Sequence, residues 1–461
     1  MSEYDLTVIG AGPGGYTAAL RAAQLGMRVA IVERDELGGV CGNWGCIPSK
    51  AIIASAELFE RAREGVELGI VASGLHFDYP RIVARSRASA KRMARGVASL
   101  LRKQKVDVIH GTARLERDRR VVVEGHGPVA SRTVLLAMGS GERLLPGLRI
   151  SPPQIVTSRE LLDERTLPGK IVIIGGGAIG VEFAYVLRTF GVDVTIVEME
   201  QQLLPGIDAA IATELAKTLR KRSVEVRTET AFVRAEIAGD SVLVRVRNSA
   251  GEEEELRADR CLVAVGRAPL TKDMGLEDAG IEIDRGRVVI DDRFTTTAEG
   301  VLAIGDLVDS PQLAHVASAE GIAAVEILAR RRPPGRLDPL KIPACVYGHP
   351  EIATVGLSEE KAAERGFDVA IGTMPFRALG RAVAGGQMDG FVKLVSSRRD
   401  GEILGCHVIG AQATDLIAEA VVAMSMEGTA WDLGRAIHAH PTFAEGIMES
   451  ALAAVGEAIN L

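Results

Sequence analysis

The sequence has few cysteines, no long apolar run and no excess of positive charge, and each shortage excludes a class of protein. No window offers about 18 uninterrupted apolar residues, so we expect no transmembrane helix. A net charge of −7 argues against nucleic acid or an anionic membrane as the main partner. The acidic start, Met1 to Asp5, runs at once into a predicted strand, so we expect no signal or transit peptide. Five cysteines in 461 residues are typical of a cytoplasmic enzyme, in which a close cysteine pair is more often catalytic or metal-binding than structural.

An internal repeat organises a chain that is long enough for about three domains. Residues 4–34 and 169–199 each show a short apolar strand, a glycine turn, an amphipathic helix and a second strand that ends in an acid. The first glycine and the terminal acid are 23 residues apart in both segments. The spacing predicts two dinucleotide-binding βαβ units in an α/β fold. The alternative is that both are plain glycine turns of an α/β sheet.

The residues of each glycine fingerprint have separate roles. The first glycine permits the tight turn, the second lets the backbone approach a pyrophosphate, and the third lets the helix pack close to the strand. The helix N-terminus offers N–H groups to the phosphates, and the acid accepts hydrogen bonds from a ribose. The candidate residues are Gly10, Gly12, Gly15 and Glu33 in the first unit, and Gly175, Gly177, Gly180 and Glu198 in the second.

The second unit favours NAD over NADP. A carboxylate at Glu198 repels a 2′-phosphate, and an NADP site needs an arginine nearby. The segment that follows, residues 199–204, contains no cation.

Composition marks two boundaries beyond the repeats. Residues 146–170 and 330–339 are rich in residues that break regular structure, which indicates linkers. Between them, the acidic run 251–256 is expected to be a solvated hairpin turn. Residues 345–461 alternate strand-like and helical patterns without a glycine fingerprint, which predicts an α+β domain.

The cysteines divide into a close pair and three single residues. Cys261, Cys345 and Cys406 lie in apolar stretches and are expected to be small core residues. Cys41 and Cys46 form the only close pair. A zinc site would need further Cys or His ligands nearby, and none is visible, so we expect no metal site. Two inert core cysteines remain an alternative, but the surrounding glycines and polar residues favour a redox disulfide.

The spacing of the pair constrains its geometry. Five residues of regular helix rise about 7.5 Å, which exceeds the 4.4–6.8 Å usual between Cα atoms of a disulfide. We therefore expect Cys41 on an irregular turn, permitted by Gly42 and Gly45, with Cys46 entering a helix. Lys50 and the helix N-terminus would favour the thiolate.

The segment before the last helix admits three interpretations. In the first, Pro441 starts the helix and Thr442 forms a capping box with Glu445. In the second, His438 and His440 bind a metal, although further ligands are missing. In the third, the histidines serve in catalysis.

Three stretches together resemble the class I pyridine-nucleotide disulfide oxidoreductases over essentially the whole chain. They are GGVCGNWGCIPSK (residues 38–50), the paired glycine fingerprints and HAHPTFAE (residues 438–445). The resemblance implies two Rossmann-like domains and a C-terminal α+β dimerisation domain. The implied boundaries are 1–148 and 271–335 for the FAD domain, 149–270 for the NAD domain and 336–461 for the dimerisation domain.

The resemblance also implies the reaction, in which FAD and NAD serve a homodimer that oxidises the dithiol of a lipoylated carrier protein. Cys46 would lie against the flavin as a charge-transfer thiolate, and Cys41 would exchange with the substrate. His440 would act as the acid–base and Glu445 would orient its imidazole, both in the active site of the partner subunit. A thiol with a pKa near 8.5 needs such a base.

Shorter motifs complete the implied cofactor sites. Most of them would line the FAD, with Asp306 on the ribityl chain, whereas Gly266 would lie near NAD. The further cofactor-binding residues are Lys50, Gly111, Thr112, Ala113, Met138, Gly139, Ser140, Glu182, Val233, Gly266, Arg267, Asp306, Leu313, Ala314 and His315.

Four residues depart from the family pattern. Family members commonly have Thr at Met138 and Asn at Leu270, a bulky apolar residue at Gly42 and a small aliphatic one at Trp44. These residues belong to the flavin and disulfide regions, which predicts an effect on redox potential or substrate access.

Two rival functions are less well supported by the sequence. A glutathione- or mercuric-type reductase would be favoured by an NADP-binding arginine or a C-terminal cysteine pair, and both are missing. A non-enzymatic NAD-sensing flavoprotein subunit would be favoured by loss of Cys41, Cys46 or His440, and all three are present.

Overall fold

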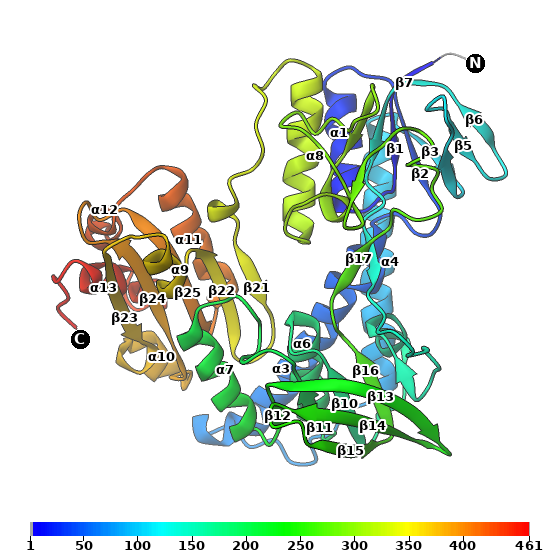
Figure 1. Ribbon diagram of the computed structural model, residues 1–461. Coiled ribbons are helices and arrows are strands. Elements are labelled where there is room, and N and C mark those ends of the chain that lie inside the picture. Colours follow the sequence, from blue (N-terminus) through cyan, green and yellow to red (C-terminus); the bar gives the residue numbers. More distant parts are fainter. Residues whose placement is uncertain (1–2, 461) are drawn as a thin grey trace. The chain divides into compact units, whose positions relative to one another are not determined.

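The computed structural model describes residues 3–460 and contains two compact units. The first unit comprises Met1–Ala51, Arg81–Arg143 and Gly266–Leu337. The second comprises Ile52–Pro80, Leu144–Val265 and Asp338–Leu461. Each unit is thus assembled from segments that are far apart in the sequence, as the mixed colours of each unit in Figure 1 show.

The first unit is built on a parallel five-stranded sheet of order β20-β7-β1-β2-β3. Helices α1 and α8 lie side by side on this sheet (Figure 1) and share its apolar core. The sheet strands are β1 (Tyr4–Ile9), β2 (Val29–Glu33), β3 (Asp107–His110), β7 (Ser131–Leu136) and β20 (Val301–Ala303). The helices and 3-10 turn are α1 (Pro13–Gln24), α2 (Gly39–Trp44), η2 (Gly305–Leu307) and α8 (Ala314–Leu328). The short strands are β4 (Ala113–Leu115), β5 (Val121–Val123), β6 (Gly127–Val129), β8 (Ser140–Glu142), β17 (Arg267–Pro269), β18 (Ile283–Asp284) and β19 (Arg287–Val288).

Two long helices begin in one unit and end in the other: α3 (Cys46–Glu64) and α4 (Tyr79–Lys103). Among residues 3–460, no helix is long and apolar enough to cross a membrane.

The second unit repeats the nucleotide-type topology and adds an antiparallel sheet. Its parallel sheet has the order β12-β11-β10-β16-β9, beside the three-stranded ribbon β13-β14-β15. The strands are β9 (Ile155–Val156), β10 (Lys170–Ile174), β11 (Asp193–Val197), β12 (Glu225–Arg227), β13 (Thr230–Ala238), β14 (Ser241–Asn248), β15 (Glu253–Ala258) and β16 (Arg260–Val263). The helices are α5 (Ser158–Asp163), α6 (Ala178–Thr189) and α7 (Ala209–Lys221), and η1 covers Gly65–Leu68.

The C-terminal part of the second unit is an antiparallel sheet of order β21-β22-β25-β24-β23 that shares a common core with most of its helices. Its strands are β21 (Ala344–Val346), β22 (Glu351–Gly356), β23 (Val369–Pro375), β24 (Gly390–Ser397) and β25 (Ile403–Gly410). Its helices are α9 (Glu359–Glu364), α10 (Gly380–Gly385), α11 (Ala413–Ser425), α12 (Ala430–Arg435) and α13 (Glu445–Ala454), with η3 (Pro339–Lys341) and η4 (Phe376–Ala378). The predicted fold class, two nucleotide-type α/β parts followed by an α+β part, is confirmed. The predicted domain boundaries stay predictions.

A buried ion pair ties α7 to this antiparallel sheet. The ammonium of Lys393 on β24 lies 2.8 Å from Asp208, the N-cap of α7, and both side chains are almost fully buried. Burial raises the pKa of Asp208, but the hydrogen bond and charge of Lys393, the nearby His407 and the Glu359 N–H together outweigh that effect and hold the pKa below the usual range.

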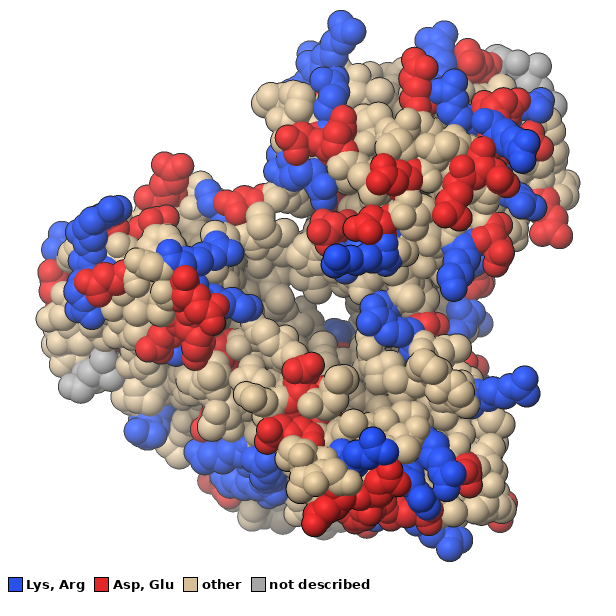
Figure 2. Space-filling model, in the orientation of Figure 1, with Lys and Arg blue, Asp and Glu red and all other residues tan. Residues whose placement is uncertain are grey.

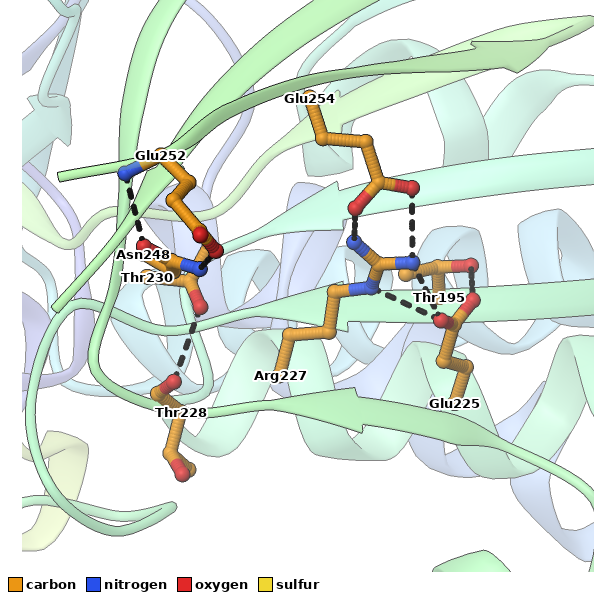
Figure 3. A network of polar contacts seen from close by, with 8 residues as sticks. All are labelled: Thr195, Glu225, Arg227, Thr228, Thr230, Asn248, Glu252 and Glu254. Carbon is orange, nitrogen blue, oxygen red and sulfur yellow. Dashed lines mark hydrogen bonds and ion pairs between the residues drawn. The ribbon is translucent and has the colours of Figure 1, made fainter. Parts of the chain in front are cut away.

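The expectation of a hairpin turn over residues 251–256 is correct for Gly251 and Glu252 but wrong for residues 253–256, because β15 already begins at Glu253. Alternate glutamates of β15 lie opposite arginines of β14, so their charges are compensated and the acidic run can form a strand. Figure 3 shows the neighbouring network, in which Arg227 donates to Glu254 at 2.5 Å and to Glu225 at 2.8 Å. Acidic and basic side chains are likewise interspersed over the face shown in Figure 2.

Two of the three single cysteines are core residues as expected. Cys261 and Cys406 are fully buried, and burial raises the pKa of each thiol to about 12. Cys345 is only partly buried, at the edge of the C-terminal core, so the expectation for that residue is wrong.

Candidate functional site

The two glycine fingerprints have the same geometry. Gly10 and Gly175 have left-handed φ values of +99° and +107°, and a Cβ on either would overlap a backbone oxygen of the adjacent strand end. A Cβ on Gly15 or Gly180 would overlap the carbonyl oxygen of that first glycine. Both residue types are therefore required by the turn and by the close approach of helix to strand.

The second glycine of each fingerprint faces open space. No atom lies within 4 Å of the position of a Cβ on Gly12 or Gly177, the N-caps of α1 and α6. Neither helix has a capping side chain or an acidic residue in its first turn. The N–H groups of the first turns therefore present positive partial charge to a space that a pyrophosphate can enter. The residues fit a dinucleotide at both places.

The terminal acids are fixed by the backbone in the same way. One oxygen of Glu33 accepts from the Ala11 N–H at 2.7 Å, and one oxygen of Glu198 accepts from the Gly176 N–H at 2.6 Å. The other oxygen of each carboxylate accepts from N–H groups of the turn that follows its strand. Both carboxylates are buried at the end of the second strand of their unit, the place where a ribose would bind.

A second group of predicted cofactor residues meets around Ser140 in the first unit. Its hydroxyl donates to Asp306 and accepts from Nε of Arg267 at 2.7 Å. Gly111 lies beside the first fingerprint, because its N–H donates to the Glu33 carbonyl at 2.9 Å.

The other predicted cofactor residues lie on separate elements. In the first unit, Thr112 and Ala113 lie where β4 begins, Met138 and Gly139 precede β8, Gly266 precedes β17, and Leu313, Ala314 and His315 begin α8. Lys50 lies on α3, one turn after Cys46. In the second unit, Glu182 is buried on α6 and accepts from the Tyr347 N–H at 3.2 Å, and Val233 lies on β13.

Glu320 was not among the predicted site residues. This residue of α8 is fully buried, and it accepts from the Gly305 N–H at 2.7 Å, which fixes the backbone next to Asp306. Burial raises the pKa of Glu320, although the Gly305 N–H and Arg336 act in the opposite direction. The available signal was an acid in the middle of a helix made mostly of small and apolar residues.

Cys41 and Cys46 form a disulfide in the first unit, with their Cα atoms 4.7 Å apart. Cys46 begins α3 as expected, but Cys41 does not lie on an irregular turn. It lies inside the short helix α2, and the chain breaks only at Gly45, with φ −147° and ψ −111°. The break at a single glycine separates two helical axes, which brings the Cα atoms closer than one continuous helix would.

The amide of Asn43 holds the disulfide-bearing segment from within. Its Nδ2 donates to the carbonyl oxygens of Leu37 and Gly39 at 3.0 and 3.1 Å. Asn43 is buried and, like Glu320, was not singled out from the sequence.

His440 and Glu445 form a pair in the second unit. Nδ1 of His440 lies 2.9 Å from one oxygen of Glu445, and the other oxygen accepts from the Thr442 N–H at 2.8 Å. Burial raises the pKa of Glu445, but these two hydrogen bonds and the electrostatic effects of His440 and His438 together outweigh it and hold the pKa below the usual range. The imidazole of His440 itself is largely exposed, with 75% of its side chain accessible.

The first of the three interpretations of this segment is wrong. The helix begins at Glu445 and not at Pro441, and Thr442 is not its N-cap, because the segment first passes through a non-helical turn. The side chain of His438 is largely inaccessible, and its Nε2 lies 2.6 Å from Glu419. Among residues 3–460, no cluster of His, Cys, Asp or Glu suited to a metal ion is present.

Comparisons with known proteins match both parts of the chain. The family described as pyridine nucleotide-disulphide oxidoreductase matches residues 4–321, and its dimerisation domain matches residues 342–451. A dihydrolipoyl dehydrogenase of Bacillus subtilis is 40% identical, covering 100% of this chain and 99% of the relative. One from Haloferax volcanii is also 40% identical, covering 99% and 97%.

Solved structures agree with this similarity. LpdA from Mycobacterium tuberculosis has a TM-score of 0.90 at 29% identity, with 97% of this chain and 98% of LpdA covered. RclA from Escherichia coli, an HOCl-induced flavoprotein disulfide reductase, has a TM-score of 0.87 at 28% identity, with 97% and 99% covered.

Proposed function

The chain belongs to the pyridine nucleotide-disulphide oxidoreductase family, and from that premise we propose that it is a dihydrolipoyl dehydrogenase. It oxidises the dithiol of a lipoylated carrier protein and reduces NAD to NADH. The observation that carries the proposal is the Cys41–Cys46 disulfide, in a chain similar along its whole length to relatives of that name.

The cofactors are FAD and NAD. The first fingerprint, Glu33 and the group around Ser140 would hold FAD, and the second fingerprint with Glu198 would hold NAD. The buried Glu198 carboxylate is the reason for NAD rather than NADP. The flavin, when bound, supplies the two-electron chemistry that couples thiol oxidation to nicotinamide reduction.

The thiol exchange is carried by the chain's own residues. A thiolate of the substrate attacks Sγ of Cys41, so that a mixed disulfide forms, the Cys41–Cys46 bond breaks and Cys46 leaves as a thiolate. The second substrate thiol then displaces Cys41, which releases the oxidised substrate disulfide and leaves two electrons on the cysteine pair.

His440 serves as the base for this exchange. With Nδ1 held by Glu445 at 2.9 Å, Nε2 can take the proton of the substrate thiol. The match to a dimerisation domain over residues 342–451 includes both residues. The active form would be a homodimer in the cytoplasm, with this pair serving the active site of the partner subunit.

The test is NAD reduction by dihydrolipoamide, measured for the purified FAD-bound protein beside Cys41→Ser and Cys46→Ser. The wild type is expected to turn over, and each variant is expected to lose almost all turnover. Oxidised glutathione with NADPH serves as the comparison for a glutathione-type reductase. Turnover with that pair and not with dihydrolipoamide would reject the proposed substrate, and full turnover by either Cys→Ser variant would reject the mechanism.

A further inference from the structure

Three consecutive side chains of α4 hold the segment that carries the redox disulfide. Arg85, Ser86 and Arg87 each donate a hydrogen bond to a backbone carbonyl oxygen of α2 or α3. The acceptors are Ala51, Pro48 and Asn43, at 2.7, 2.8 and 2.5 Å respectively. Two of these contacts secure α3, which carries Cys46, and the third secures α2, which carries Cys41.

Arg87 makes two contacts with the end of α2. Its Nη1 donates to the Asn43 carbonyl, and its guanidinium carbon lies 4.1 Å from the centroid of the Trp44 ring. These are the last two residues of α2, which has six residues and is too short to be stable alone. The Asn43 amide already fixes the start of the segment, so Arg87 closes its other end.

We propose that Arg87 is a positioning residue for the redox disulfide: through Asn43 and Trp44 it holds α2 so that Cys41 stays within bonding distance of Cys46. This rests on the part of the proposed function in which the pair is redox-active, and not on the identity of the substrate. Reduction cleaves the bond and leaves α2 joined to α3 through Gly45, where the chain already breaks. Contacts that keep α2 in place then raise the effective concentration of one thiol near the other, which favours the disulfide.

The charge of Arg87 would act in the opposite direction. A guanidinium near a cysteine favours the thiolate and therefore the reduced form. Arg87→Lys separates the effect of positioning from the effect of charge. Lysine keeps the positive charge but lacks the planar guanidinium, which can stack on Trp44 and donate to a carbonyl at the same time. Trp44→Leu removes the stacking surface and leaves the hydrogen bond to Asn43.

The experiment measures the equilibrium between dithiol and disulfide in the full-length, FAD-bound protein. The protein is equilibrated without oxygen in glutathione buffers, in which oxidised glutathione plus the Cys41–Cys46 dithiol gives two reduced glutathiones plus the disulfide. Free thiols are then alkylated, and the alkylated share of the two cysteines is read from peptide masses.

We expect Arg87→Ala to lower the disulfide-to-dithiol ratio about tenfold at a fixed glutathione ratio, the effect of one hydrogen bond from a charged group. A tenfold change corresponds to a midpoint potential about 30 mV higher. Arg87→Lys and Trp44→Leu should shift the ratio in the same direction by smaller factors. The control is Arg92→Ala on the same helix, an exposed arginine for which no side-chain hydrogen bond or ion pair is described within residues 3–460, and it should match the wild type.

An Arg87→Ala ratio equal to the wild type, or a ratio shifted toward the disulfide, would overturn the proposal. If Arg87→Ala does not retain FAD, the ratios of Arg87→Lys and Trp44→Leu are used instead. Ratios equal to the wild type, or shifted toward the disulfide, would then overturn the proposal. Because no dihydrolipoamide is present, the result is independent of whether that compound is the substrate.

Discussion

Nδ1 of His440 lies 2.9 Å from Oε1 of Glu445, across the non-helical turn that precedes α13. The carboxylate fixes the tautomer, because Nδ1–H donates to it and Nε2 is left to exchange a proton. The second carboxylate oxygen is held by the Thr442 N–H at 2.8 Å, so Glu445 is itself oriented before any substrate binds.

Glu445→Gln should lower kcat for dihydrolipoamide oxidation by about 100-fold, because the imidazole loses the charge that stabilises its protonated form. The KM for NAD should stay within twofold, since the proposed NAD site lies on other elements. The matched control is Glu457→Gln, which removes an exposed carboxylate 3.4 Å from Arg435. A kcat for Glu445→Gln within twofold of this control would refute the role of the pair.

Gly42→Ala should raise the stability of the protein. Gly42 is buried inside α2, yet no atom lies within 4 Å of the position of its Cβ, so a methyl group fits. Alanine in place of glycine inside a helix stabilises by about 1 kcal/mol or less. Gly45→Ala is the contrasting variant, since its Cβ would lie 3.2 Å from the Val40 carbonyl oxygen. In thermal unfolding of the FAD-bound protein, the Tm of Gly42→Ala should lie above that of the wild type and the Tm of Gly45→Ala below it. The reverse order would show that a methyl group does not fit at Gly42.

Exchange of Glu198, the proposed ribose-binding acid, should change the nicotinamide preference. Glu198→Ser combined with Met199→Arg removes the charge that repels a 2′-phosphate and adds a cation at a residue that is 70% exposed. We expect the ratio of kcat/KM for NAD to that for NADP to fall at least tenfold, as measured in the dihydrolipoamide assay. Met199→Arg alone is the control, and it should leave NAD preferred. An unchanged ratio in the double variant would place the discrimination elsewhere.

His407 should make the protein less stable in mild acid. The residue is buried on β25, its Nε2–H donates to the Leu357 carbonyl at 2.9 Å, and burial lowers its pKa below the ordinary value near 6.5. As the pH falls below that value, the unfolded chain binds a proton that the folded protein does not, so the free energy of unfolding decreases. The loss is at most about 1.4 kcal/mol per pH unit.

Chemical denaturation at pH 7.5 and 5.5 checks this effect. The wild type should lose more stability between these two pH values than His407→Gln, which cannot titrate. His126→Gln, at an exposed histidine, should behave as the wild type. Equal losses in the wild type and His407→Gln would show that His407 is not held neutral by the fold.

The glycine fingerprints could be predicted from the sequence because their geometry is local. A turn, a helix N-terminus and an acid 23 residues later specify one βαβ unit without reference to the rest of the chain. The break at Gly45 could be predicted only in part. Spacing excluded a continuous helix, but it could not show that Cys41 lies in a short helix of its own.

The contacts that hold the disulfide segment could not be predicted. Arg87 and Asn43 are 44 residues apart in the sequence, and no periodic pattern joins a helix residue to a carbonyl at that distance. The turn prediction for the acidic run 251–256 failed for a related reason. Repeated like charges suggest a solvated turn until the arginines of the opposite strand are known to pair with them.

The most direct test of the account is to reduce the purified, FAD-bound protein with dihydrolipoamide in the absence of NAD, quench with acid, and map alkylated cysteines by mass. We predict that Cys41 and Cys46 are blocked before reduction and become alkylated together afterwards, while the alkylation of Cys261, Cys345 and Cys406 does not change. The account would be contradicted if both members of the pair were already alkylated before reduction, or stayed blocked in a protein that turns over dihydrolipoamide.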